Sequence, residues 1–280
     1  MKFKNLEEKC QYYRCLTDYK LLPNSNILVM LDGKNFSSLI KNNFKKPFDD
    51  DFIGMMNKTA QFLCNNVQGV KFAFTQSDEI SLLITDYDTP ETDVFFGGRL
   101  CKIQSILASL ATSEFNRQFI KYHLFEKRDN WSGVCFGDIC DELVNLKLAQ
   151  FDCKAWVVPS QNDAFAWFLY RQIDCIRNPK QQFAQTYLAH KQLVGKDTDE
   201  QIRLCKESTG NDWTALANEY KYGRFVYKVA EPMQTTLPNG ETIDYVRNKF
   251  KVSPAVELTD VFNKDLFYEK AFNVKAGEEL

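Results

Sequence analysis

The chain has 280 residues, a formal net charge of -2, and a composition that is 44% hydrophobic and 26% charged. This length can bury a substantial core in one large domain or two smaller ones, and the composition excludes extensive disorder. The charge balance excludes a general attraction to nucleic acid, so binding a polyanion requires a local basic patch.

The first long apolar run, Ile27–Leu31, stops at Asp32 and Gly33. This pattern predicts a buried strand that places an acid at its end. Apolar residues at helical spacing then predict one helix from Phe36 to Phe44 and a second over Asp50–Val67.

The next stretch, FAFTQSDEISLL, places two adjacent acids between two short apolar runs. It predicts a β-hairpin with Asp78 and Glu79 at its tip. Acidic residues are also common in solvated turns, so this pattern does not by itself identify a functional site.

A helix is predicted over Gly98–Phe119, with Arg99 and Lys102 in its first turns. Cations there oppose the helix dipole unless an anion binds. The later predicted elements are a strand over FDCKAWVVP, a helical stretch from Asp163 to Val194 that Pro179 breaks or kinks, a helix from Thr198 or Asp199 to Gly210, and a hairpin turn at Asn239 and Gly240. The order of helices and strands indicates an α+β fold rather than a doubly wound one.

Neither the cysteines nor the histidines form a recognisable metal motif. The nine cysteines include no CxxC pair, which favours reduced thiols over a zinc site. We interpret the two histidines, His123 and His190, as packed or surface residues. His190 stands beside Lys191 and is a secondary candidate for an RNA contact, as is Arg224 within the basic segment KYGRFVYK.

No apolar run approaches the roughly eighteen residues of a membrane span, and the N-terminal segment lacks the apolar core of a signal peptide. We therefore expect a cytoplasmic location and no membrane partner, with a mitochondrial location left open.

Asp32 and Asp78 are the strongest candidates for chemistry, because strands that neighbour each other in a sheet can direct two carboxylates at one divalent cation. Magnesium takes such oxygen ligands together with phosphate oxygens. Two ions in such a site support nucleotidyl transfer. The turn amides from Gly33 to Phe36 are candidates for holding a triphosphate.

Five segments carry a resemblance to a known family: LDGKNF (Leu31–Phe36), KPFD (Lys46–Asp49), QSDEIS (Gln76–Ser81), RLCK (Arg99–Lys102) and YRQIDC (Tyr170–Cys175). They occur in the order of the tRNA-His guanylyltransferase-like family and, with further similarity up to Lys228, span about residues 27–228. Members of this family add nucleotides to RNA 5′ ends in the 3′-to-5′ direction.

The resemblance implies a polymerase-palm-like (ferredoxin-like) antiparallel sheet with flanking helices. Within this fold we expect a palm-like core over residues 1–160, a helical fingers-like region over 161–228 and a C-terminal hairpin extension over 229–280. It further implies two Mg²⁺ ions held by Asp32, the Gly33 carbonyl and Asp78, with Glu79 supporting them and Lys46 acting in early activation. ATP or GTP is the expected nucleotide, tRNA the expected partner and a homotetramer the expected assembly.

The family also implies where the substrates bind. The expected nucleotide-binding residues are Gly33, Lys34, Asn35, Phe36, Ser77 and Lys102. The expected RNA contacts are Arg171 and Asn178, together with His190, Lys191 and Arg224, although an exposed helix arginine without such a role is an equal reading for Arg171.

Two departures from the tRNA-His-specific enzymes refine the assignment. Met30 stands where those enzymes carry Arg, and IRNP (Ile176–Pro179) stands where they carry His-Ile-Asn-Asn. The chain is more similar to the branch that extends 5′-truncated tRNAs against a template, so we expect tRNA repair. The alternatives are a tRNA-His-specific guanylyltransferase, a palm-fold cyclase or dinucleotide synthase using the same acids, and a non-catalytic RNA-binding module.

Overall fold

The computed structural model describes residues 2–126, 135–238, 240–259 and 261–274. Six antiparallel strands form one sheet in the order β4-β1-β3-β2-β5-β6. The strands are β1 (Asn26–Gly33), β2 (Val70–Gln76), β3 (Glu79–Thr85), β4 (Phe151–Val158), β5 (Arg224–Thr236) and β6 (Thr242–Pro254). The α+β class and the antiparallel sheet predicted from the sequence are therefore confirmed.

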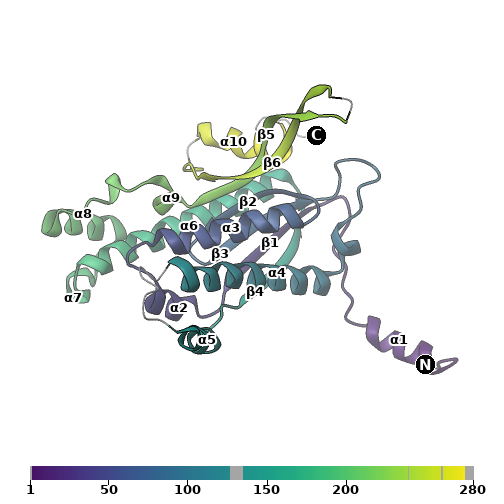
Figure 1. Cartoon of the computed structure of the whole chain (residues 1–280), viewed down its shortest axis with the longest axis horizontal. Helices are drawn as coiled ribbons and strands as arrows, with labels where there is room; N and C mark the ends of the chain where they lie inside the picture. The colour runs from purple at the N-terminus through teal and green to yellow at the C-terminus, as the bar shows by residue number, and fades with distance from the viewer. Residues whose placement is uncertain (1, 127–134, 239, 260, 275–280) are drawn as a thin grey trace.

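Helices cover both faces of the sheet (Figure 1). One face packs against α3 (Asp50–Asn66) and α4 (Leu100–Lys121), and the other against α6 (Gln161–Tyr187) and α10 (Val261–Phe272). The remaining helices are α1 (Leu6–Cys15), α2 (Phe36–Asn43), α5 (Phe136–Val144), α7 (His190–Leu193), α8 (Thr198–Thr209) and α9 (Asn218–Tyr222), and short turns of other helix types are η1 (Phe95–Gly98), η2 (Tyr122–Glu126) and η3 (Trp213–Ala215).

Strand alternation explains why both faces are apolar. In β1, Val29 and Leu31 point to the α3 and α4 side, whereas Leu28 points to the α6 side and packs in a cluster with Phe72 and Leu83. All five side chains are fully buried. A strand buried on both faces reads as a continuous apolar run, and this is the pattern that made β1 and β3 predictable.

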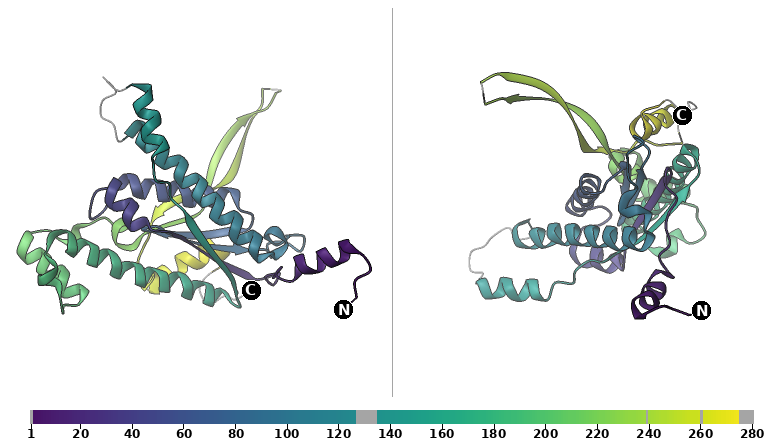
Figure 2. Two further views of the ribbon diagram at one scale, coloured as in Figure 1. Left: turned by 90° about the horizontal axis from the view of Figure 1, so that it is seen from below. Right: turned by 90° about the vertical axis from the view of Figure 1, so that its right-hand side faces the viewer.

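Several parts extend from this layered body (Figures 1 and 2), the end of α4 with α5 and three others among them. The first is α1, which has no buried residue. The second is the far ends of β5 and β6, because β5 pairs with β2 only from Arg224 to Tyr227 and then continues as a two-stranded arm. The third is the end of α6 with α7 and α8, which has a small core of its own around Phe183. In the described part of the chain, no helix is long and apolar enough to cross a membrane.

The structure confirms most elements predicted from the sequence and corrects one. α6 does not break at Pro179 but continues through it to Tyr187. Pro179 removes one backbone hydrogen bond, but Cys175 and Phe183 on either side are buried and their packing sustains the helix. Of the predicted turn residues, Asn239 lies outside the described residues. The expected three-part division stays a prediction, and its boundary at residues 228 and 229 falls inside β5.

Gly33 ends β1 where no larger residue fits. A Cβ atom built on Gly33 would lie 2.3 Å from Cδ2 of Phe36. The Phe36 ring is held between Phe115 and Phe151, at centroid distances of 5.1 and 5.0 Å, and is 1% exposed. The glycine therefore allows β1 to end directly against the aromatic core.

We expect Gly33→Ala to lower the free energy of unfolding by about 1–3 kcal/mol, because the added methyl group overpacks a ring that cannot move aside. Chemical denaturation measures this change. Gly54→Ala in α3 is the matched control, since its Cβ meets no atom within 4 Å, and it should be neutral or stabilising by up to about 1 kcal/mol. Equal effects of the two substitutions would contradict the steric argument.

Candidate active site

Asp32 is the last residue but one of β1, between acids on both neighbouring strands. The antiparallel register places it opposite Glu79 of β3 and opposite Asp152 of β4. Directly opposed residues project from the same face of a sheet with their Cβ atoms about 5 Å apart. Asp152 was not among the predicted site residues, because the sequence shows an acid in a strand but not the register that brings it to Asp32.

Asp78 reaches the same place from the tip of the β2–β3 hairpin. Ser77 adopts a left-handed backbone conformation with φ of 49°, and its hydroxyl donates to Asp78 Oδ1 at 2.8 Å. The Gly33 amide donates to the Asp78 carbonyl oxygen at 3.1 Å, which ties the end of β1 to the tip. A cleft of about 270 Å³ opens here, lined by Asp32, Ser77, Asp78 and Glu79 from the sheet and by Arg171 and Asn178 from α6, among others.

The electrostatics of this cluster are unfavourable without a cation. Burial raises the pKa of Asp32, and the neighbouring charge of Asp152 raises it further. Burial also raises the pKa of Asp78, and Asp32 adds to the effect. Carboxyl groups whose ionisation is opposed by burial and by like charge are typical of functional sites.

The donor set suits magnesium. In the described residues, no group of three or more His, Cys, Asp or Glu side chains is arranged to hold a metal ion. Asp32 and Asp78 with the adjacent Gly33 carbonyl are instead an incomplete, all-oxygen set. Magnesium is usually held by one or two carboxylates, with phosphate oxygens and water completing the coordination. The residues present therefore fit an ion that binds together with a phosphate-bearing substrate.

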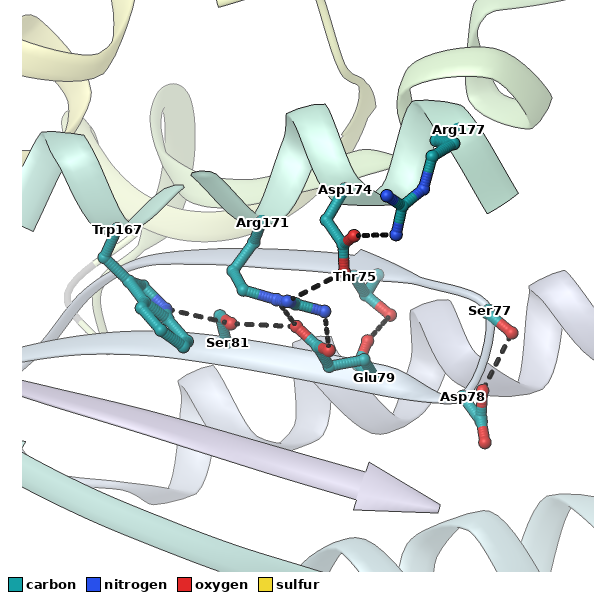
Figure 3. A network of polar contacts seen from close by, with 9 residues as sticks. All are labelled: Thr75, Ser77, Asp78, Glu79, Ser81, Trp167, Arg171, Asp174 and Arg177. Carbon is teal, nitrogen blue, oxygen red and sulfur yellow. Dashed lines mark hydrogen bonds and ion pairs between the residues drawn. The ribbon is translucent and has the colours of Figure 1, made fainter. Parts of the chain in front are cut away.

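Arg171 is not exposed for RNA but is paired with Glu79, as Figure 3 shows. Its Nε donates to Glu79 Oε1 at 2.7 Å and its Nη2 donates to Glu79 Oε2. Its side chain is 11% exposed, so the alternative of an exposed helix arginine is wrong. The expected RNA contact stays a prediction, since Arg171 lines the cleft while it pairs with Glu79. Burial is the largest single influence and lowers the pKa of Arg171, but the hydrogen bonds to Glu79 and the negative charges of Glu79 and Asp174 together raise the pKa above its ordinary range.

The predicted phosphate cradle is smaller than expected. The Gly33 amide is taken by Asp78, and the Lys34 amide donates to the Gln150 carbonyl oxygen at 2.8 Å. The amides of Asn35 and Phe36 lie at the start of α2, where Asn35 has φ of 59° and no side chain caps the helix. The Lys34 side chain is exposed, whereas the Phe36 ring belongs to the core. The structure thus leaves the Lys34 side chain and the first amides of α2 for phosphate.

Lys102 does not line the cleft, contrary to expectation. Helix α4 begins beside Lys20 and Leu21, which precede the start of β1, and this start of β1 pairs with Thr85 at the end of β3 opposite Glu79. Thr112 of α4 accepts a hydrogen bond from the Phe151 amide, level with Gly33. Lys102 precedes Thr112 by ten residues, about 15 Å along a helix axis. Its ammonium group lies 5.4 Å from the centre of the Phe96 ring.

The other expected contacts are dispersed. Asn178 is exposed and lines the cleft, and Lys46 is exposed on the loop between α2 and α3. His190 and Lys191 are exposed on α7, in the region beyond the end of α6. Of these four residues, only Asn178 lines the cleft.

Arg224 is buried rather than exposed for an RNA contact. It is 3% exposed, and its Nε donates to Asn57 Oδ1 at 2.8 Å. It lines a second cavity of about 60 Å³, which shares Gln76 and Ser77 with the acidic cleft. Burial lowers the pKa of Arg224 to about 10. Although Arg224 belongs to a basic segment of the sequence, its side chain lies in the protein interior.

Comparisons with known proteins identify the family and support the fold. The family model described as tRNAHis guanylyltransferase matches residues 7–159. A probable tRNA(His) guanylyltransferase of Dictyostelium discoideum is 25% identical over 89% of this chain and 90% of its own. An uncharacterised protein of Acanthamoeba polyphaga mimivirus is 27% identical over 93% of this chain and 88% of its own. A solved bacterial tRNA(His) guanylyltransferase-like protein in complex with ATP superposes with a TM-score of 0.74 at 26% identity, covering 95% of this chain and 97% of the other.

The raised pKa of Asp32 makes a prediction about stability. Its carboxyl group binds its proton more tightly in the folded than in the unfolded protein, so stability falls as pH rises from about 4 through the folded pKa. Asp32→Asn should therefore raise the melting temperature of the metal-free protein at pH 7, and the difference should disappear below pH 4. Differential scanning calorimetry over this pH range measures it.

The same substitution should have the opposite effect on function. We expect loss of a metal ligand to lower the rate of nucleotide addition by more than about 100-fold, because replacing a residue that only hydrogen-bonds to a ligand lowers activity by up to about that factor. Mg²⁺ should also raise the melting temperature of the unmodified protein more than that of the variant. A variant that is both less stable at pH 7 and fully active would refute the assignment of Asp32.

Proposed function

The chain belongs to the tRNAHis guanylyltransferase family and is a nucleotidyltransferase, and from this we propose that it repairs the 5′ ends of truncated tRNAs by template-directed addition in the 3′-to-5′ direction. The observation that carries the proposal is the convergence of Asp32 and Asp78 beside the uncapped start of α2. Acids that need a cation thus lie beside amides that suit phosphate.

Asp32, Asp78 and the Gly33 carbonyl would hold Mg²⁺. When bound there, Mg²⁺ supplies positive charge that stabilises phosphate oxygens and lowers the pKa of an attacking hydroxyl group. The ligands are preorganised, because the Gly33 amide bonds to the Asp78 carbonyl and the Ser77 hydroxyl to the Asp78 carboxylate. The two carboxylates are therefore held by main-chain geometry as well as by their side chains.

The surrounding residues would bind and orient the phosphates. The first amides of α2 point their partial positive charge outward, as helix N-termini do at phosphate sites. The exposed ammonium groups of Lys34 and Lys46 add mobile positive charge on either side of α2. Helix α6 covers one side of the cleft through Arg171 and Asn178 and limits the access of water there. Positioning and charge stabilisation are the main contributions a protein makes to phosphoryl transfer.

Template direction is supported by the segment IRNP. Asn178 of this segment lines the cleft, and the neighbouring Arg177 is held by Asp174 at 2.9 Å. The segment shares only Asn178 with the His-Ile-Asn-Asn motif of the tRNA-His-specific enzymes and lacks its histidine. Base pairing within the acceptor stem can select the incoming nucleotide without any protein contact to its base. This supports repair over specific guanylylation.

Three further features of the function belong to the proposal. ATP and GTP are the proposed nucleotides, since related solved proteins are described in complex with each. A homotetramer is the proposed assembly, on the resemblance to the family. A cytoplasmic location, expected from the sequence, is the third feature.

The decisive experiment uses one 5′-truncated tRNA prepared with each of the four template bases opposite the missing position. With Mg²⁺ and all four nucleotides, we expect addition of the complementary nucleotide in each case, and addition that slows or stops once the stem is fully paired. A sequencing gel identifies the added nucleotide.

Intact tRNA-His and a variant with a changed anticodon are the comparison substrates, and Asp78→Asn is the inactive control. Guanosine addition that ignores the template base and depends on the His anticodon would replace repair with specific guanylylation. Joining of nucleotides without RNA would instead indicate a cyclase or dinucleotide synthase.

A further inference from the structure

Glu79 occupies a position from which it would be expected to bind the cation, yet both of its oxygen atoms are engaged elsewhere. It lies opposite Asp32 on the same face of the sheet and directly follows Asp78. Its carboxylate is nevertheless turned toward α6, where Arg171 binds Oε1 through Nε and Oε2 through Nη2 (Figure 3). The Ser81 hydroxyl also lies 3.4 Å from Oε1.

Arg171 is itself held in place on several sides. Its Nη1 donates to Asp174 Oδ2 at 3.2 Å. Its guanidinium carbon lies 5.8 Å from the Trp167 ring centre and 5.4 Å from the Tyr170 ring centre. Trp167 in turn donates from Nε1 to the Ser81 hydroxyl at 3.2 Å. A planar guanidinium group fixed in this way has one orientation, and that orientation matches the two oxygen atoms of a carboxylate.

We propose that Arg171 is a positioning residue that withholds Glu79 from the divalent cation, so that the protein offers Asp32 and Asp78 as its carboxylate ligands. This inference rests on the proposed function, because it concerns the same cation site. It assigns Glu79 a place beside the ligands but not among them. It also assigns Arg171 a role in the reaction that the RNA contact expected from the sequence did not include.

The physical reason lies in how many negative charges a magnesium site can usefully contain. Each added carboxylate binds the cation more tightly, but it also neutralises more of the positive charge that the phosphates need. One or two carboxylates together with phosphate oxygens are the usual set for phosphate substrates. The Cβ atom of Glu79 lies about 5 Å from that of Asp32 on the same face of the sheet, so its carboxylate is within reach of the ion unless it is held elsewhere. The paired oxygens of Glu79 are held by Arg171.

A purely structural role makes a different prediction. If the ion pair serves only to fasten α6 to the sheet, its loss should lower stability and leave the intrinsic affinity for metal unchanged. The two roles can therefore be separated by measuring binding of the metal alone, without nucleotide, RNA or turnover.

The experiment titrates the full chain with Mn²⁺ and measures free Mn²⁺ by electron paramagnetic resonance, with Mg²⁺ as competitor. Arg171→Met should bind Mn²⁺ about tenfold more tightly, a change of the size produced by residues behind metal ligands. Turnover at saturating metal should fall. Arg171→Lys keeps the charge but can hold one oxygen only, so it should give an intermediate gain in affinity.

Two controls identify Glu79 as the cause. The double variant Glu79→Gln with Arg171→Met keeps the net charge of the pair and should bind Mn²⁺ as the unmodified protein does. Arg177→Met removes an arginine from the same helix that also bonds to Asp174 but is 62% exposed, and it should leave Mn²⁺ affinity unchanged. The double variant also serves if Arg171→Met fails to fold, because replacing a buried ion pair by neutral groups of similar volume is usually tolerated.

Three results would overturn the proposal. The first is unchanged or weaker Mn²⁺ binding by folded Arg171→Met. The second is Arg171→Lys with the affinity of the unmodified protein, which would show that only the positive charge matters. The third is weaker binding by the double variant, which would make Glu79 a ligand. Loss of Mn²⁺ binding in Asp32→Asn, with no effect at Arg171, would leave the proposed function intact and refute this inference alone. Absence of Mn²⁺ binding by the unmodified protein, both alone and with ATP present, would refute both.

Discussion

The mutual repulsion of the carboxylates at the end of β1 is the constraint that the rest of the structure must offset. Asp32 has Glu79 on one neighbouring strand and Asp152 on the other, and Asp78 approaches from the hairpin tip. Like charges directly opposite each other weaken a sheet. The arrangement persists because the surrounding structure is strong enough to hold it.

That strength comes from the two apolar faces of the sheet. Strands β1, β2 and β3 contribute buried side chains to both faces, and α3, α4, α6 and α10 cover them. A one-residue slip of register would exchange the two faces and bury the wrong side chains throughout. The same packing that stabilises the core therefore fixes which acids face each other. Stability gained in the core is what permits an unfavourable charge cluster at its edge.

Helix α6 connects this cluster to the rest of the molecule. Its first half packs Phe165 and Phe168 against the sheet, its middle carries Arg171 to Glu79, and its last turns bury Phe183 among α7 and α8. The helix continues through Pro179 because packing on both sides outweighs one missing hydrogen bond. A displacement of α6 relative to the sheet would thus be felt at Glu79. The guanidinium group of Arg171 thus couples the acids to the helix that leads into the helical region beyond the sheet.

The sequence by itself determined the local elements and the principal acids. Continuous apolar runs identified β1, β2 and β3, and they placed Asp32 at a strand end and Asp78 at a hairpin tip, because burial and turn chemistry act over a few neighbouring residues. The segments around these acids also carried the family resemblance. The antiparallel α+β class followed from the order of the elements.

Only the tertiary structure decided what each charged residue does. Arg171 and Arg224 look alike in sequence, yet one pairs with Glu79 and the other lies in the interior beside Asn57. Lys102 belongs to a segment that carries the family resemblance, but it lies in the first turn of α4, away from the cleft. Only the register of β4 shows that Asp152 lies opposite Asp32. A charge is defined by its distance to other charges and by its access to water, and both depend on residues far apart in the chain. Local sequence patterns do not contain those distances. The fold class could therefore be predicted from the sequence, whereas the electrostatics of the site could not.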